Sequence, residues 1–334
     1  MIEFLLAVLK GGAMGAANVI PGVSGGTIAF ITGIYERLIN AIKSCGPKAI
    51  KLLLGRRFKE FAQHVDLWFL IAIALGAVLA IWKLAGTLEE AFREHPIPTR
   101  AFFFGLILAS IWGVGKMVKR WGAGRVIALL IGLAAAIGLL FLPHSPSNDS
   151  FGFLIICGAV AISSMIIPGV SGSFVLLIMG NYALVLGAIS DRDLGILIPF
   201  GIGCVVRLLS LSHLLSWIFK HHHDIAVALI TGFIVGSLVL IWPWKETIHK
   251  KDDSGAYIVK TEKRELVPRP GSLAEVTKSL GAEEELVTVG YKNWHAPDFK
   301  EKSTMPALLL ALGGALLVIL IEVIGAKFGR PRKT

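Results

Sequence analysis

The sequence predicts an all-α integral membrane protein, and three observations lead to this fold class. Of its 334 residues, 54% are hydrophobic and only 17% are charged, with a mean hydropathy of +0.72. A soluble domain carries roughly a quarter charged residues. Several apolar stretches have the ~20 residues that a helix needs to cross the hydrocarbon core. Because the alternating pattern of outer-membrane strands is absent, a helical bundle is the architecture that satisfies the backbone in lipid.

The apolar stretches divide into uninterrupted and interrupted ones. Two regions, 11–42 and 151–189, are each broken by Pro-Gly. The uninterrupted spans are expected to be single transmembrane helices. They lie at 67–88, 99–117, 124–142, 194–219, 225–243 and 305–326.

The charges set the expected topology. The net charge of +10 does not indicate nucleic acid, because lysine and arginine cluster at 43–59, 116–125 and 327–333, between or after apolar spans. Basic loops of this kind face the cytoplasm. This placement puts both termini inside and requires each Pro-Gly region to return to its own side as a re-entrant hairpin. The first opens inward, the second outward, and the polar segment 244–303 lies outside.

An internal repeat underlies this topology. Pro21-Gly22-Val23-Ser24-Gly25 recurs as Pro168-Gly169-Val170-Ser171-Gly172, 147 residues later, and Gly33 matches Gly180 at the same spacing. After the basic loop of the first copy the offset becomes 127, where Gly76 matches Gly203. Matches at constant offset favour duplication over chance. One connecting span makes the second copy inverted, an arrangement typical of secondary transporters with midplane sites.

The repeat predicts the organisation of the chain. Each unit is expected to hold a broken hairpin and two transmembrane helices, and the insert to be small or partly disordered. The expected segments are a first repeat at 1–122 with a cytoplasmic loop at 43–66, a connecting helix at 123–150, an inverted second repeat at 151–245, an extracytoplasmic insert at 246–303, and a last helix with a basic tail at 304–334.

The Pro-Gly-Val-Ser-Gly breaks are the predicted substrate site. Proline ends the incoming helix, whose arm from Lys10 covers ~15 Å, or half the hydrocarbon core. The outgoing helix directs free amides and a positive dipole end at the break, which suits an anion. A competing explanation is that small residues merely allow close helix packing. The candidate substrate-binding residues are Asn18, Gly22, Ser24, Gly25, Gly26, Thr27, Gly169, Ser171, Gly172, Ser173 and Arg207.

Arg207 is included because it falls near the middle of span 194–219, where the first repeat has Ala80. An ionisable group at that depth is a functional candidate, although pairing with a carbonyl or snorkelling would also explain it. Gating is the second role considered, and for Glu36 and Arg37 an interfacial ion pair explains the residues equally well. The candidate gating residues are Tyr35, Glu36, Arg37 and Tyr182.

No cofactor or metal site is expected. The three cysteines, Cys45, Cys157 and Cys204, suggest neither a disulfide framework nor metal-binding spacing. The run His221-His222-His223 is expected in a short cytoplasmic turn, since consecutive residues do not share a helix face. It is therefore interpreted as interfacial.

The two motifs and their flanks carry a family resemblance. GAANVIPGVSGGTIAFITGIYERLINAI (15–42) and SSMIIPGVSGSFVLLIMGNYALVLGAI (163–189) resemble the bacterial polyprenyl-phosphate transporters, formerly a membrane family of unknown function. The resemblance covers nearly all the chain except 246–303. It implies a non-enzymatic flippase in the cytoplasmic (inner) membrane that recycles undecaprenyl phosphate for cell-envelope synthesis. Its partners would be the polyprenyl phosphate and membrane lipids, with no nucleic acid; homo-oligomerisation is left open.

Two rival functions are retained at this point. One is a transporter of another anionic lipid or small anion, which would keep the site and change the ligand. The other is an integral-membrane polyprenyl-pyrophosphate phosphatase, whose Pro-Gly-x-Ser-Arg-Ser loop uses an arginine to bind phosphate. Here Gly25 and Gly172 occupy the arginine position, and the ten residues before Pro21 contain no carboxylate for acid–base chemistry.

Overall fold

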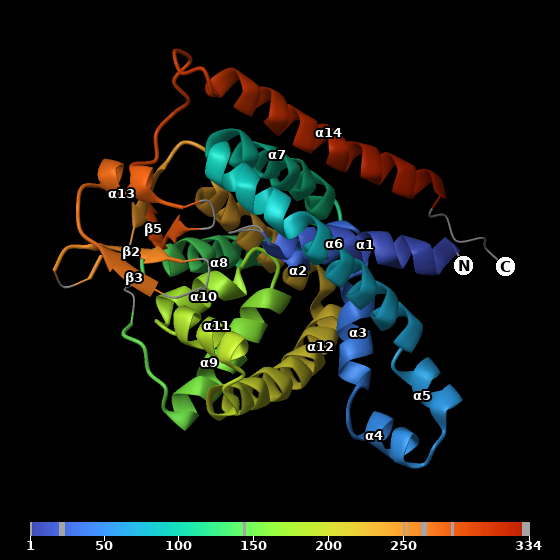
Figure 1. Cartoon of the computed structure of the whole chain (residues 1–334). Helices are drawn as coiled ribbons and strands as arrows, with labels where there is room; N and C mark the ends of the chain where they lie inside the picture. The colour runs from blue at the N-terminus through green and yellow to red at the C-terminus, as the bar shows by residue number, and fades with distance from the viewer. Residues whose placement is uncertain are drawn as a thin grey trace.

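The computed structural model describes residues 2–19, 24–142, 145–249, 251–252, 254–261, 266–281 and 284–328. Within these ranges apolar helices form a bundle, and a small segment with β-strands lies at one end of it (Figure 1). The predicted helical membrane architecture is confirmed at this level. Helices α6, α7, α8 and α12 each contain a stretch long and apolar enough to cross a membrane.

The first half of the chain contains a broken hairpin, a basic loop with two short helices, and three long helices. These elements are α1 (Ile2–Val19), α2 (Gly25–Ile31), α3 (Tyr35–Ser44), α4 (Pro47–Leu54), α5 (Phe58–His64), α6 (Leu67–Glu94), α7 (Pro96–Gly115) and α8 (Ala123–Leu140).

The second half has the same order of helices, with the polar insert before the last one. The helices are α9 (Phe151–Ile166), α10 (Gly172–Ile178), α11 (Tyr182–Asp191), α12 (Leu194–Ile241) and α14 (Thr304–Phe328). The insert contains β1 (Glu246–His249), β2 (Tyr257–Lys260), β3 (Leu266–Arg269), α13 (Leu273–Ser279), β4 (Glu285–Leu286) and β5 (Thr288–Lys292).

The element boundaries repeat as the sequence does. Helices α10 and α11 begin and end 147 residues after α2 and α3, and α12 begins 127 residues after α6. The turn glycines Gly33 and Gly180 both have left-handed backbone, with φ of +70° and +75°. His95 separates α6 from α7 with φ −133° and ψ 59°, and His222 has nearly the same conformation inside α12.

Close helix contacts recur at the same positions. Gly76 on α6 packs so tightly on α1 that a Cβ atom would overlap the carbonyl oxygen of Val8. Gly203 on α12 makes the equivalent contact with the carbonyl of Ile155 on α9. Small residues permit such backbone approach in membrane bundles. The duplicated sequence therefore produces duplicated packing.

The correspondence between the two halves also includes α8 and α14, which make matching contacts. Gly132 on α8 packs against the carbonyl of Leu229 on α12, and Gly314 on α14 packs against the carbonyl of Phe102 on α7. Leu229 and Phe102 are themselves 127 residues apart. Each unit thus carries one more equivalent helix than the sequence comparison indicated.

Helix α1 is longer than the arm expected before Pro21. It has 18 residues, which correspond to about 27 Å, because it continues through Lys10 instead of starting there. The Lys10 ammonium donates a hydrogen bond to the carbonyl oxygen of Thr32 at 2.8 Å. The Lys10 ammonium therefore has a hydrogen-bond partner within the first hairpin, and α1 extends on both sides of this residue.

One further expectation differs from the structure. The histidine run forms no separate turn: His221–His223 lie within α12, which is kinked at His222. The insert, expected to be small or partly disordered, holds two small sheets in its described part. Strands β1 and β5 pair as a two-stranded sheet, and β3-β2-β4 form a three-stranded one.

The glycine contacts generate a stability prediction. Replacing Gly203→Ala should lower the unfolding temperature in detergent, because overpacking costs about 1–3 kcal/mol. Gly201→Ala is the matched control, since a Cβ atom there meets nothing within 4 Å. Unfolding followed by intrinsic fluorescence measures both variants. Equal midpoints for the two would contradict the proposed tight contact.

Candidate functional site

The two breaks lie against each other, more than 130 residues apart in sequence. The Ser24 hydroxyl donates to the carbonyl oxygen of Met165 at 3.3 Å. The Tyr35 hydroxyl donates to the carbonyl of Ile166 at 3.1 Å, and the Gly169 amide donates to Thr27 Oγ1 at 2.8 Å. We call these three hydrogen bonds the seam.

Gly22, a candidate binding residue, lies outside the described residues. Of the other glycines in the breaks, Gly169 requires its residue type most clearly. Its φ is +88°, and a Cβ atom would lie 2.5 Å from the carbonyl oxygen of Phe233. Gly26 has the same constraint from the opposite side, since its Cβ would lie 2.8 Å from the carbonyl of Ile166. The seam thus depends on backbones that approach without side chains.

The first break already provides acceptors for its own helix amides. Ser24 is the N-cap of α2, and its Oγ accepts from the Gly26 amide at 3.2 Å. Asn18 Oδ1 accepts from the Gly25 amide at 2.8 Å. The structure therefore brings together four of the predicted binding residues, Asn18, Ser24, Gly25 and Gly26. Together they form the capped N-terminus of α2.

The second break is different. The N-cap residue Ser171 makes no capping bond with its side chain and instead contacts the Ser173 hydroxyl at 2.9 Å. Met165 takes the place of Asn18, with its Cγ 2.6 Å from where a Cβ of Gly172 would lie. In the described part of the chain no side chain caps the start of α10. Ser173 is exposed, whereas Ser171 and Gly172 are buried.

Arg207 belongs to the same neighbourhood. It is exposed on α12, and its Nε donates to Ser163 Oγ on α9 at 2.9 Å. Ser163 lies one turn before the end of α9 at Ile166, whose carbonyl takes part in the seam. Among described carboxylates none pairs with this guanidinium. The partner Ser163 was missed from the sequence, where a serine in an apolar helix carries no distinctive signal.

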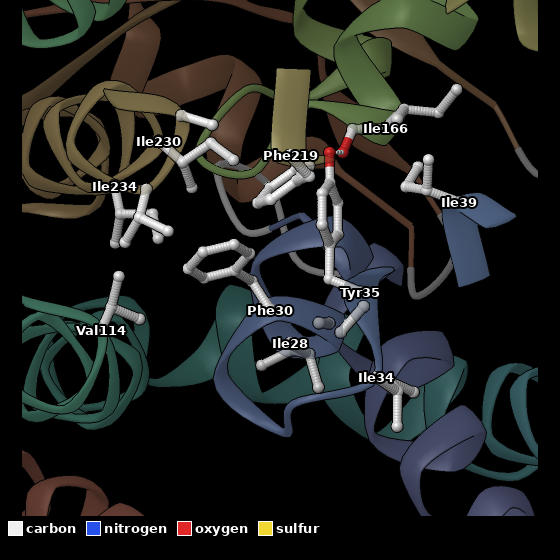
Figure 2. Close-up of a cluster of buried hydrophobic side chains, with 14 of the residues drawn as sticks. Ile28, Phe30, Ile34, Tyr35, Ile39, Val114, Ile166, Phe219, Ile230 and Ile234 are labelled. Carbon is white, nitrogen blue, oxygen red and sulfur yellow. Dashed lines mark hydrogen bonds between the residues drawn. The ribbon is translucent and has the colours of Figure 1, made fainter. Parts of the chain in front are cut away.

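Tyr35 is the gating candidate with the clearest position. It is 3% exposed, and its ring packs edge-on against Phe30 and Phe219 at centroid distances of 5.3 and 5.7 Å. Figure 2 shows the ring near Phe219, with the hydroxyl directed at Ile166. Its counterpart Tyr182 packs against a separate cluster around Cys157 and makes no contact across the seam in the described residues.

Glu36 and Arg37 do not pair with each other. Arg37 Nε lies 2.6 Å from Asp66 Oδ2, and the guanidinium stacks over Phe69. Glu36 Oε1 lies 3.3 Å from His223 Nε2, next to the α12 kink. Both residues therefore join α3 to other helices near the end of the bundle that carries the basic loop.

A polar cavity of about 280 Å³ opens beside Tyr35, between α3 and α12. Its lining includes Glu36 and Lys220, together with Phe219, which contacts the Tyr35 ring. Ser216, also in the lining, bonds to Asn40 Oδ1 at 2.8 Å and accepts from Lys43. Tyr35 thus lies between this cavity and the seam.

Metal-binding chemistry has no support in the described ranges, where no three histidine, cysteine, aspartate or glutamate residues gather to hold an ion. The available chemistry is that of amides, hydroxyls and one exposed guanidinium. Such donors suit an oxyanion.

Comparisons with known proteins agree with the motif resemblance. The family described as undecaprenyl phosphate translocase-like matches residues 14–258. A polyprenyl-phosphate transporter of Vibrio cholerae is 41% identical over 80% of this chain and 87% of its own length. One of Staphylococcus aureus is 32% identical over 71% of this chain and 85% of its own length. No solved structure matches. The chain belongs to the undecaprenyl phosphate translocase-like family.

Proposed function

We propose that this protein moves undecaprenyl phosphate across the bacterial cytoplasmic membrane and returns the lipid carrier for cell-envelope synthesis. The phosphate is held at the paired breaks, and the site opens to each side in turn. The relatives named polyprenyl-phosphate transporters support the substrate class. The observation that carries the mechanism is the seam, which joins the two breaks from separate halves of the chain.

The phosphate is assigned chiefly to the second break. The α10 amides lack a side-chain cap, and Ser171, Ser173 and Arg207 add hydroxyl and guanidinium donors nearby. A phosphate monoester carries a charge of about −1.5 to −2 at neutral pH and accepts several hydrogen bonds. The first break, with its amides already capped, supports the site through the seam. The prenyl chain stays in lipid.

The inverted topology is part of the proposal. Helices α4 and α5, the start of α1 and the end of α14 lie at one end of the bundle, and the insert lies at the other (Figure 1). This separation supports a cytoplasmic basic loop and cytoplasmic termini, with the insert outside. The two hairpins then enter the membrane from opposite faces as re-entrant elements.

Alternating access requires the seam to separate. Each of its three hydrogen bonds contributes about 0.5–1.5 kcal/mol, so their loss is within reach of substrate-binding energy. Movement of Tyr35 away from the Ile166 carbonyl would connect the polar cavity with the breaks. Rocking of one repeat against the other is the general route by which inverted repeats transport.

Leaflet exchange of labelled undecaprenyl phosphate in proteoliposomes tests this function. Arg207→Ala and Ser171→Ala should each slow exchange about tenfold or more, because each removes a donor to the phosphate. Arg57→Ala, an exposed arginine paired with Glu60 in the basic loop, serves as the control and should exchange normally. Normal exchange by both site variants would refute the assignment of the phosphate to the second break.

The seam has its own test. Thr27→Val keeps the side-chain shape but leaves the Gly169 amide without its acceptor, which costs about 1–3 kcal/mol. We expect slower exchange and a lower unfolding temperature. Thr27→Ser restores the hydroxyl and should recover both quantities. A valine variant indistinguishable from wild type would show that this bond contributes nothing.

The phosphatase alternative is separated by a direct assay. Purified protein incubated with undecaprenyl pyrophosphate should release no phosphate, since glycines stand where the loop arginine of such enzymes acts. An authentic membrane pyrophosphatase in the same detergent is the positive control. Release of phosphate at a rate that scales with the amount of this protein would overturn the transporter assignment.

A further inference from the structure

Two basic side chains lie together at the insert end of the bundle. Lys245, which follows α12, is 7% exposed, and its Nζ lies 3.6 Å from the centroid of the Tyr291 ring on β5. The guanidinium of Arg100 on α7 lies 5.7 Å from the centroid of the same ring. Three separate segments thus bring two basic groups onto one aromatic ring.

No carboxylate among the described residues pairs with either cation. Glu246, the neighbour of Lys245, instead faces Lys292, with Oε2 3.7 Å from Nζ. Burial, and secondarily the charge of Arg100, lower the pKa of Lys245 to about 6. The buried indole nitrogen of Trp244 also has no hydrogen-bond partner. Unpaired donors and like charges in a low-dielectric site are stabilised by an anion.

An apolar groove of about 590 Å³ has Phe104, Leu238, Trp242 and Trp294 in its lining, residues of α7, of α12 and of the segments that carry Lys245 and Tyr291. Phe104 follows Arg100 by one helical turn, so both lie on the same face of α7. The Trp242 ring contacts Phe104 at 5.2 Å and the Trp244 ring at 5.6 Å between centroids. The groove and the cations are therefore parts of one amphipathic surface.

We propose that this surface is a second docking site, at the insert end of the bundle, for a phosphate monoester that carries a prenyl chain. The phosphate lies between Lys245 and Arg100 and accepts from Trp244 Nε1, while the first isoprene units occupy the groove. The inference rests on the proposed function and places the capture of substrate from the outer leaflet here, apart from the breaks. Trp residues at the mouth suit a lipid interface.

Proton uptake distinguishes this site from the breaks. In the free protein at pH 8 Lys245 is neutral, because its pKa of about 6 lies below that pH. A phosphate monoester has a second pKa near 6 and is already dianionic at pH 8. Binding raises the Lys245 pKa and draws one proton from the buffer. No lysine is among the donors proposed at the breaks, so proton uptake reports on the site at Lys245.

Calorimetric titration of the full-length protein in detergent at pH 8 tests the proposal, with farnesyl phosphate as the probe. Two buffers of different ionisation enthalpy report the proton uptake. Wild type should take up close to one proton. Lys245→Met should abolish the uptake and weaken the binding of this probe about tenfold. Lys245→Arg should bind within a few-fold of wild type without uptake.

The controls identify the ligand source. Lys292→Met removes an exposed lysine adjacent to Tyr291 and should behave as wild type. Farnesol should cause no proton uptake, and inorganic phosphate should bind far more weakly than farnesyl phosphate. Equal affinity for inorganic phosphate would show that the site binds a free anion. It would overturn the proposed binding of a prenyl phosphate. Absence of uptake in wild type would mean that the cations only clamp Tyr291.

Leaflet exchange by wild-type protein keeps this inference separate from the proposed function. Exchange without proton uptake would overturn the docking site alone. Proton uptake without exchange would overturn translocation alone and leave a lipid-phosphate binding site.

Discussion

The structure depends on satisfying the backbone where two apolar helical hairpins are interrupted. A helix that ends at a proline leaves carbonyls without partners, and lipid offers no water to replace them. Here the end of α9 is satisfied from the other half of the chain, by the hydroxyls of Ser24 and Tyr35. Thr27 Oγ1 also accepts a hydrogen bond from the Gly169 amide. Side chains of the first half thus satisfy backbone groups of the second, and these bonds hold the two distant motifs together.

The two halves have matching elements, but a few residues make them unequal. Asn18 caps α2, whereas its counterpart Met165 cannot cap α10. Arg207 stands where the first repeat has Ala80. The second half therefore has no counterpart of the Asn18 cap but carries an arginine that the first half lacks. The physical result is one closed, structural break and one electropositive break with free donors, which is why the proposed phosphate site is asymmetric within a symmetric scaffold.

Basic side chains that no described carboxylate pairs with occur at two levels of the molecule. Arg207 lies beside the breaks, and Lys245 with Arg100 lies beneath the insert. At the opposite end, Lys220 and Glu36 line the polar cavity beside Tyr35. An anionic headgroup moving between such places would exchange one set of donors for another without full desolvation. Each level combines a polar centre with an apolar surround, as a lipid phosphate requires.

Local pattern determined much of this protein. Hydropathy located the spans, because the length of a helix in lipid is set by bilayer thickness. The offsets of 147 and 127 anticipated the matching boundaries of α2 and α10 and the start of α12. The tertiary structure determined the contacts between residues far apart in sequence, which periodicity does not encode. The bond of Arg207 to Ser163, the bonds across the seam and the convergence of Lys245 and Arg100 on Tyr291 all depend on how distant helices pack. The sequence marked Arg207 and the seam residues as candidates without predicting their partners, and it singled out neither Lys245 nor Arg100.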